Sequence, residues 1–510
     1  MPMIDLFSES YQLKQRSQAQ QRCVNWNYER YEGNGDKTKT ASALATTLGA
    51  RLVATMSASP NSVNRSIYLS SAGTAPEFTP RIYGAWGDSV YRFNRDNKTN
   101  YKIGTITDNG TPVNMTDNGQ GGYLLIVDGI SAYSTRMGDS DGVQSLSVVP
   151  MPKMPLSTDP IQPTHCAFIG QRLFVNAKGS SYFFYGDITD PVTMDGGTVF
   201  QDGNFYSDES SGDIIKALCV VNGSLLTLGF RSYSLWQITN NQDNPLSVTS
   251  GTSNAVGIEA PYSLAGIDDK AFWLASSDVG GIGVYMLQNA TLTRVSTQGI
   301  DEQLMDISNR ASAEGCAYSL KGATFYVLSF IGENRTFVYD HSVDKWHERL
   351  SRDFNTGDWK SWMYNHVIHV NGQIFAGVAF GASAFVELRD DIYTEYDGSQ
   401  IVRMGSSKVL FDDLNPVCIQ ELTLDMLVGY TELLTGQGSD PKIMLQISRD
   451  GGETWSSIST RSLGKQGNYR KKVSWSGLGT AVNWAFRISV SDPVPCHIYQ
   501  TKVRYTKGVV

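Results

Sequence analysis

Alternating apolar and polar residues dominate the chain between about residues 80 and 400. Pairs of such stretches flank a tight turn of glycine, asparagine or aspartate, as in ALCVVNGSLLTLG and HVIHVNGQIFAGV. Side chains on one face of a strand recur at every second position, so each unit predicts a β-hairpin. The turns stand at Gly87-Asp88, Asp128-Gly129, Gly170-Gln171, Asn222-Gly223, Asp268-Asp269, Lys321-Gly322 and Asn371-Gly372.

These turns lie roughly 40 to 50 residues apart, which is the repeat length of β-propeller blades. One blade cannot cover both faces of its own sheet, whereas a closed ring buries the faces between neighbours. We therefore expect an all-β protein with a β-propeller of six or seven blades over residues 61–404. Stacked β-sandwiches would also contain frequent hairpins, but the even spacing favours the propeller.

The pattern changes at both ends of this region. From residue 405 onward the alternating strands are longer, as in VCIQELTLDMLVGY and VNWAFRISVSD, and glycine-rich loops join them. This predicts an additional C-terminal β-sandwich over residues 405–510. Residues 1–60 contain the polar stretch SYQLKQRSQAQQRC, which predicts a helix or an extended arm. We expect this section to form an N-terminal arm and a strand that joins the propeller.

Composition supports a β-rich fold and excludes several functions. The chain has 49 glycines and 11% aromatic residues, and its net charge is -8 with 18% charged residues. No lysine or arginine block is suited to gripping nucleic acid specifically, and an acidic wall would let DNA slide past. No apolar leader or run of 18 apolar residues occurs, so we expect synthesis in the cytosol and no membrane anchor.

One motif raises the question of catalysis. The stretch SRDGGETW has the Ser-x-Asp-x-Gly-x-Thr-Trp pattern of the Asp-box, a hairpin known from sialidases. We expect the aspartate to accept hydrogen bonds from turn N–H groups, the glycines to adopt positive φ, and the tryptophan to pack into the core. Only one copy is present, outside the repeat, which favours a structural turn over a catalytic marker. The turn residues are Ser448, Asp450, Gly452, Thr454 and Trp455.

Other reactive constellations are missing from the sequence. The six cysteines lie far apart without a CxxC pair, which is typical of buried thiols and not of a zinc site. His366 and His369 are three positions apart in a predicted strand, so they point to opposite faces and cannot share a metal. No GxSxG elbow occurs. We expect no enzyme activity, no metal and no cofactor.

Four stretches occur in an order that resembles a known family. They are QRCVNWNYERYEG, PRIYGAWGDSVYRFN, GIGVYMLQNATLTRVSTQGIDEQL and TFVYDHSVDKWHER, and they span residues 21–350. Together they resemble the tail-hub or nozzle proteins of short-tailed bacteriophages, also called packaged-DNA stabilisation or tail accessory proteins. The residues that carry the resemblance are Asn25, Glu29, Tyr91, Arg92, Tyr285, Arg294, Ser296, Thr297, Tyr339, Asp340 and Trp346. Tyr28 departs from the family pattern, where a proline is usual.

The resemblance implies a structural virion protein of the phage tail. Such subunits form a ring, expected to be a homohexamer, beneath the portal and adaptor rings. They extend the channel for double-stranded DNA, retain the packaged DNA until ejection, and anchor tailspikes, fibres or a needle. In this view Arg294 anchors a blade or an interface. The polar segments Asn94–Asn118 and Gln201–Gly212 are candidate contact or lumen loops.

Two alternatives remain open. A glycan-binding or glycan-hydrolysing propeller, similar to a sialidase or depolymerase, would need an arginine or acidic cluster at the propeller mouth. A cellular kelch-like adaptor would show a tighter Gly-Gly and Tyr…Trp repeat than this chain has.

Overall fold

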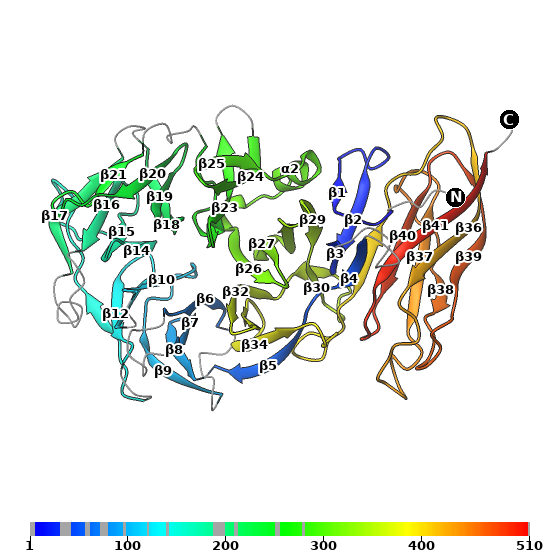
Figure 1. Cartoon of the computed structure of the whole chain (residues 1–510), viewed down its shortest axis with the longest axis horizontal. Helices are drawn as coiled ribbons and strands as arrows, with labels where there is room; N and C mark the ends of the chain where they lie inside the picture. Colours follow the sequence, from blue (N-terminus) through cyan, green and yellow to red (C-terminus); the bar gives the residue numbers. More distant parts are fainter. Residues whose placement is uncertain are drawn as a thin grey trace.

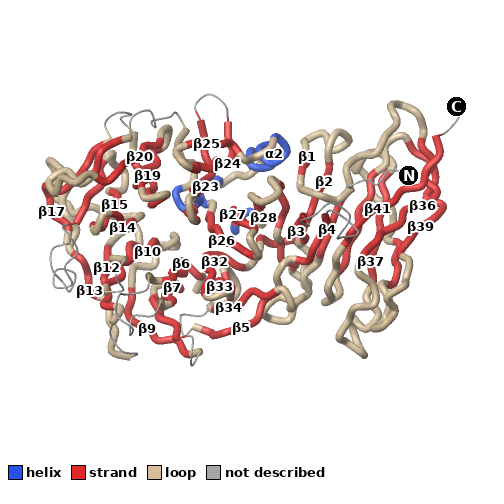
Figure 2. Tube along the Cα trace, in the orientation of Figure 1, coloured by secondary structure: helices blue, strands red, loops and turns tan. Residues whose placement is uncertain are grey.

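The computed structural model describes residues 6–30, 42–56, 62–71, 80–94, 98–119, 122–138, 142–186, 199–208, 213–249, 256–277 and 281–507. A ring of sheets forms one end of the elongated molecule and a sandwich of two sheets forms the other (Figure 1). Nearly all regular structure is strand, and the helix α2 (Gln298–Met305) lies at the rim of the ring (Figure 2). No helix in the described ranges is long and apolar enough to cross a membrane.

The described residues form seven four-stranded antiparallel blades. Blade 1 consists of β6 (Asn64–Leu69), β7 (Ile82–Trp86), β8 (Ser89–Asn94) and β9 (Thr99–Thr105). Blade 2 consists of β10 (Asn114–Asp117), β11 (Tyr123–Val127), β12 (Ala132–Arg136) and β13 (Ser147–Val149). Blade 3 consists of β14 (Cys166–Ile169), β15 (Arg172–Asn176), β16 (Tyr182–Gly186) and β17 (Phe200–Ser207). Blade 4 consists of β18 (Ile215–Val221), β19 (Ser224–Gly229), β20 (Tyr233–Ile238) and β21 (Leu246–Val248).

The remaining blades follow the same plan, with one strand taken from the beginning of the chain. Blade 5 consists of β22 (Ala265–Ile267), β23 (Lys270–Ser277), β24 (Gly281–Gln288) and β25 (Thr291–Arg294). Blade 6 consists of β26 (Glu314–Leu320), β27 (Ala323–Phe330), β28 (Arg335–Asp340) and β29 (Lys345–Glu348). Blade 7 is β32 (Tyr364–Val370), β33 (Gln373–Val378), β34 (Ala384–Arg389) and, as its outer strand, β5 (Gly49–Thr55).

The blades close into a ring. Their inner strands contact one another in sequence order from β6 to β32, and β32 also contacts β6. A separate hydrophobic cluster fills each of the seven blade interfaces in the described residues. At the closing interface, the Phe385 ring of blade 7 lies 4.9 Å from the Phe93 ring of blade 1. Burial on both faces of every blade is what a closed ring provides.

Each of the seven predicted turns falls in a different blade. The first two join the second and third strands of their blades, whereas the other five join the first and second strands. The positive-φ residues suit this role: Asn222 has φ 43° and Gly223 has φ 71° between β18 and β19. Such paired positive φ values match the twist of a two-residue hairpin.

The sandwich combines both ends of the sequence. One sheet contains β3 (Trp26–Arg30), β4 (Ser42–Thr46), β41 (Ile498–Lys507), β36 (Val417–Met426) and β39 (Val473–Ala481). The other contains β2 (Gln20–Val24), β35 (Arg403–Ser406), β40 (Ala485–Val490), β37 (Lys442–Ser448) and β38 (Ser459–Ser462), with β1 (Tyr11–Gln12) paired to β2. Trp26, Trp475 and Trp484 are buried in the core between the sheets. A two-stranded sheet of β30 (Leu350–Arg352) and β31 (Trp359–Ser361) follows blade 6.

Propeller and sandwich share a continuous sheet. β2 pairs in parallel with β29 of blade 6, where Val24 lies opposite Glu348, and its other edge pairs with β35. The stretch expected to be a helix or an extended arm therefore forms the β1–β2 hairpin within the sandwich. The segment of residues 94–118, expected to be a loop, contains β9 and β10, and the segment of residues 201–212 contains most of β17. Residues 95–97 and 209–212 lie outside the described residues.

Candidate functional site

Arg294 ties helix α2 to blade 5. It ends β25 opposite Tyr285, and its guanidinium lies 6.0 Å from the centre of the Tyr285 ring. Its Nη2 donates to the Ile282 carbonyl at 3.0 Å and to the Asp301 carboxylate at 2.7 Å. Asp301 stands in the first turn of α2, where the helix dipole favours a negative charge. The expected anchoring role of Arg294 thus corresponds to contacts within the chain.

Ser296 and Thr297 shape the connection from blade 5 to α2. The Ser296 hydroxyl accepts a hydrogen bond from the Val284 N–H at 3.0 Å. Thr297 is the N-cap residue of α2, and its carbonyl accepts from the Asp301 N–H at 2.9 Å, while its side chain forms no capping bond. Both residues therefore position the backbone that leaves the blade.

Trp346 links the same connection to blade 6. Its buried indole donates to the Val295 carbonyl at 2.8 Å, and the Tyr339 ring lies 5.3 Å away. The Tyr339 hydroxyl donates to Asp344 at 2.8 Å. Motif residues that are about 50 positions apart in sequence thus meet in the interface between blades 5 and 6, where they hold the two blades together.

Asn25 joins three parts of the chain. It is buried with φ 57°, a left-handed conformation that asparagine tolerates better than most residues. Its Nδ2 donates to the carbonyls of Leu350 and Val402, each at 2.8 Å, and its Oδ1 accepts from the Leu350 N–H at 3.0 Å. The N-terminal segment, β30 and the linker to the sandwich are therefore fixed to one another.

A buried ion pair next to Asn25 was not found from the sequence. Glu348 is fully buried, and Arg22 donates to both of its carboxylate oxygens, from Nε at 2.8 Å and from Nη2 at 2.5 Å. The Ser10 hydroxyl also donates to Glu348, and Arg335 lies 3.8 Å away. Burial would raise the pKa of Glu348, but the neighbouring arginines and Ser10 lower it below its usual value. No sequence signal pointed to this pair, because both strands, QQRCV and KWHE, are mostly polar.

Glu29 and Asp340 line one open cleft of about 490 Å³ beside blade 6. Lys321, on the wall of this cleft, forms a 2.7 Å ion pair with Asp390. Burial raises the pKa of Glu29, and Lys321 opposes that rise. Asp340 is already engaged, because it accepts from the Ser342 N–H at 2.9 Å and from its hydroxyl at 2.6 Å. Asp340 thus serves a turn, and the cleft brings together motif residues from β3 and β28.

Tyr91 and Arg92 lie apart from the other motif residues, in β8 of blade 1. The buried Tyr91 ring packs edge-on against Trp86 at 6.0 Å. Arg92 is also buried and donates to Gln144 at 3.4 Å. Tyr91 therefore lies in the interface between blades 7 and 1, and Arg92 contacts blade 2.

The Asp-box turn has the predicted hydrogen bonds. Asp450 accepts from the Thr454 N–H and hydroxyl and from the Ser448 hydroxyl, whose oxygen accepts from the Gly452 N–H at 2.8 Å. Although desolvation opposes it, these bonds lower the pKa of Asp450 to about 2. Gly452 has φ 106°, and a Cβ there would lie 2.8 Å from Gln20. The turn therefore packs against the N-terminal hairpin, away from the propeller mouth.

Trp455 does not enter the core as expected. It is only half-buried, and the Arg487 guanidinium lies 3.9 Å from its ring centre. The core of the sandwich is already filled by Trp26, Trp475 and Trp484. A cation–π contact at the surface replaces the predicted packing.

Side chains cross the axis of the propeller at one face. Tyr262 precedes β22 of blade 5, yet its ring stacks on His165, which precedes β14 of blade 3, at 5.2 Å. Its hydroxyl is hydrogen-bonded to the side chain of Thr111, which precedes blade 2. Burial lowers the pKa of His165 to about 4, so its ring is neutral at physiological pH. These contacts join blades that are not neighbours, so they block the space along the propeller axis at this face.

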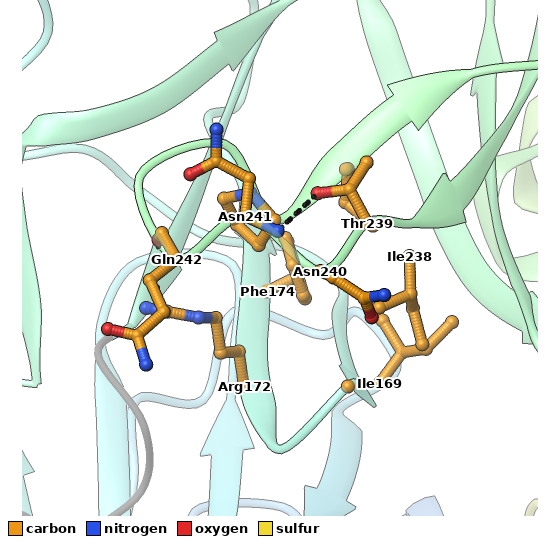
Figure 3. Close-up of a pocket in the computed structure, with 11 residues that line it drawn as sticks. Ile169, Arg172, Phe174, Ile238, Thr239, Asn240, Asn241 and Gln242 are labelled. Carbon is orange, nitrogen blue, oxygen red and sulfur yellow. Dashed lines mark hydrogen bonds between the residues drawn. The ribbon is translucent and has the colours of Figure 1, made fainter.

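A small pocket of about 110 Å³ lies between blades 3 and 4 (Figure 3). The loop after β20 forms one wall, where the Asn241 N–H donates to the Thr239 hydroxyl at 3.3 Å. Arg172 in β15 donates to the Gln242 carbonyl at 3.1 Å and is thereby engaged. None of the described residues that line this pocket carries a carboxylate, so it offers amide hydrogen bonds but no acid–base pair.

Metal and thiol chemistry gain no support from the geometry. No three His, Cys, Asp or Glu side chains of the described residues come together as metal ligands. None of the six cysteines is in a disulfide; three of them are buried and three are partly buried. Burial raises the pKa of Cys316 and Cys496 to about 11, which keeps both thiols protonated at neutral pH.

Two family models match the chain. The one described as "Bacteriophage P22 Gp10, beta-propeller" matches residues 71–379, which is more than half of the chain. The one described as "Bacteriophage P22 Gp10, beta-sandwich" matches residues 403–506. The chain belongs to the P22 Gp10 family. It is therefore a structural protein of a phage tail and a virion component, and the expected propeller with a C-terminal sandwich is confirmed.

Comparison with individual proteins adds little to this family assignment. The crystal structure of the Cps50 (Swd1) beta-propeller domain from Myceliophteria thermophila shares 11% identity with the P22 Gp10 family member described here, with a TM-score of 0.39. The match covers 67% of this chain and 99% of the Cps50 domain. No curated protein matches the chain.

Proposed function

We propose that this P22 Gp10 family member is the hub or nozzle subunit of a short-tailed phage. It assembles as a ring, expected to be a homohexamer, below the portal and adaptor rings. There it extends the DNA channel, retains packaged DNA until ejection, and anchors tailspikes, a fibre or a needle. The main support is the continuous sheet through which blade 6 passes into the sandwich.

A shared sheet makes the two units one stiff body. Backbone hydrogen bonds run from β26 through β29, β2 and β35 to β38 without a flexible linker between the units. The pair Arg22–Glu348 and the Asn25 side chain reinforce the same junction. A wall that carries pressurised DNA and bears appendages needs such stiffness, whereas domains joined only by a linker move relative to one another.

The proposed DNA path runs between copies of the chain and not through the propeller. An axis that the Tyr262 side chain spans, from blade 5 to His165 and Thr111, has no room for double-stranded DNA. A ring of several copies would enclose a wider channel. With a net charge of -8 per chain, its wall would repel phosphates and let the duplex slide.

The glycan-acting alternative has weaker support. The Asp-box contacts the N-terminal hairpin at Gln20, so it marks a junction and not a substrate site. The pocket between blades 3 and 4 has no carboxylate among its described lining residues. The larger cleft beside blade 6 contains Glu29 and Asp340, but Asp340 already accepts hydrogen bonds from the Ser342 N–H and hydroxyl. Glycan hydrolysis by the usual mechanism needs two carboxyl groups flanking the bond.

Imaging of purified virions tests the proposal. Electron cryo-microscopy should show this chain as a ring between the adaptor and the distal appendages, and light scattering of the purified chain with its adaptor should show ring formation. Particles that lack the chain should lose packaged DNA. A chain that lies elsewhere in the virion, or that does not assemble with the adaptor, would refute the proposed role.

A further inference from the structure

The end of the sandwich opposite the Asp-box carries two adjoining loops, residues 427–441 and 463–472, here called the loop pair. It exposes aromatic and apolar side chains: Tyr430 is 49%, Tyr469 is 54% and Leu434 is 81% exposed. The two tyrosine rings lie 4.9 Å apart, so they form one surface. Clustered exposed apolar side chains typically mark an interaction site.

The loop pair is built as a unit. The Gly467 N–H donates to the Gly429 carbonyl at 3.1 Å, and the Thr431 N–H donates to the Gln466 side chain at 3.1 Å. Gly429 has φ 75°, and a Cβ there would lie 2.6 Å from the Asn468 backbone. The loops therefore touch through backbone atoms and hold their exposed side chains in place, which lowers the entropic cost of binding.

The loop pair carries a net positive charge on an acidic protein. Its second loop contains Lys465, Arg470, Lys471 and Lys472, and its first loop contains two acidic residues, Glu432 and Asp440. Lys471 donates to Ser462, and Lys472 pairs with Glu421. Lys465 and Arg470 are exposed and form no ion pair with any described residue. Two positive charges therefore remain available to a partner.

These features fit an acidic protein surface, and a second copy of this chain supplies one. Tyrosine beside arginine is typical of protein interfaces, whereas a phosphate backbone would leave the exposed Leu434 without an apolar partner. Each copy carries a net charge of -8. Two loop pairs would repel each other, so a symmetric loop-to-loop contact is unfavourable. The contact must therefore join different surfaces, and a repeated contact of that kind forms a ring when its rotation closes.

We propose that the loop pair binds an acidic face of the next copy, head to tail, in the ring. This inference rests on the proposed ring assembly and names the surface that forms it. Lys465 and Arg470 provide the charge attraction, and Tyr430, Leu434 and Tyr469 provide the buried apolar contact.

Light scattering on the full-length chain tests the proposal. Lys465→Glu with Arg470→Glu should weaken self-association at least tenfold, and Tyr469→Ala should weaken it while leaving the charge unchanged. High salt should weaken the wild type and have less effect on the double variant. Lys178→Glu, an exposed charge reversal on the propeller, is the matched control and should assemble as the wild type does. Unchanged thermal midpoints would show that the variants are folded.

Each other outcome overturns the inference. If the variants assemble as the wild type does, another surface forms the ring, and the proposed hub function stands. If assembly is intact but binding of the adaptor or of a short DNA duplex is lost, the loop pair serves that partner instead. If the wild type stays monomeric even with its adaptor, this inference and the proposed ring fail together.

Discussion

Replacing Arg22 with methionine should destabilise the junction of propeller and sandwich strongly. The substitution keeps most of the side-chain volume but removes both hydrogen bonds to the fully buried Glu348. Removing one partner of a buried ion pair costs about 3–5 kcal/mol, because the other charge is left unpaired in a low-dielectric site. Ser10 and Arg335 still reach Glu348, so we expect a loss near the lower end, about 3 kcal/mol.

Denaturant unfolding followed by tryptophan fluorescence measures this loss, and an exposed ion pair provides the control. Lys321 and Asp390 form a 2.7 Å pair whose side chains are more than half exposed. Lys321→Met should therefore cost no more than about 1 kcal/mol. Adding Glu348→Gln to Arg22→Met should recover part of the loss, because a neutral amide replaces the unpaired carboxylate.

The pH dependence gives a second readout of the same pair. The pKa of Glu348 is lowered in the folded chain, so its contribution is present above the unfolded value of about 4.3 and disappears as the pH falls below it. Without Arg22, the charged form of the buried Glu348 carboxylate destabilises the folded chain at neutral pH, and protonation removes that cost. The loss of unfolding free energy in Arg22→Met should therefore become smaller toward acidic pH. A deficit below about 1 kcal/mol, or one independent of pH, would refute the reasoning.

Three further predictions test other parts of the structure. Trp346→Phe removes the indole bond to Val295 and should cost about 1 kcal/mol in thermal or denaturant unfolding; no change would show that this bond does not hold blades 5 and 6 together. Asp450→Ala should cost about 1–2 kcal/mol at pH 7 and less near pH 2, where about half of the wild-type carboxylate is itself protonated; an equal loss at both pH values would contradict the turn geometry. Burial raises the pKa of Glu395 to about 7, so the free energy of unfolding should fall as the pH rises from about 4.3, the unfolded value, to 7. Glu395→Gln should remove this pH dependence from a series of unfolding midpoints, and an unchanged pH dependence would contradict the raised pKa.

The hairpin signals carried most of the fold prediction. Each predicted turn marks one blade, because a tight turn needs residues that accept positive φ, such as Asn222 and Gly223, whatever the surroundings are. The local signal did not show which two strands of a blade each turn joins. It also did not reveal that blade 7 is completed by β5, because that pairing joins residues more than 300 positions apart.

The motif residues show the same division. Asp450 could be assigned to its turn because its partners Ser448 and Thr454 lie within four residues. The prediction that Trp455 packs into the core was wrong, because other tryptophans, distant in sequence from Trp455 or on another strand, occupy the sandwich core. The resemblance pointed to Arg294 as an anchor, but its partner Asp301 and the helix it holds became visible only in the structure.

The sequence by itself determined the β-rich class, the repeat of the blades, the change of pattern near residue 405 and the local turns, because each depends on neighbouring residues. The tertiary structure decided what depends on distant ones. It brought the N-terminal strands into the sandwich and into blade 7, paired Arg22 with Glu348, and placed Tyr262 across the axis. Strand pairing and charge burial depend on which distant segments come together once the ring has closed. A local sequence pattern does not contain that information.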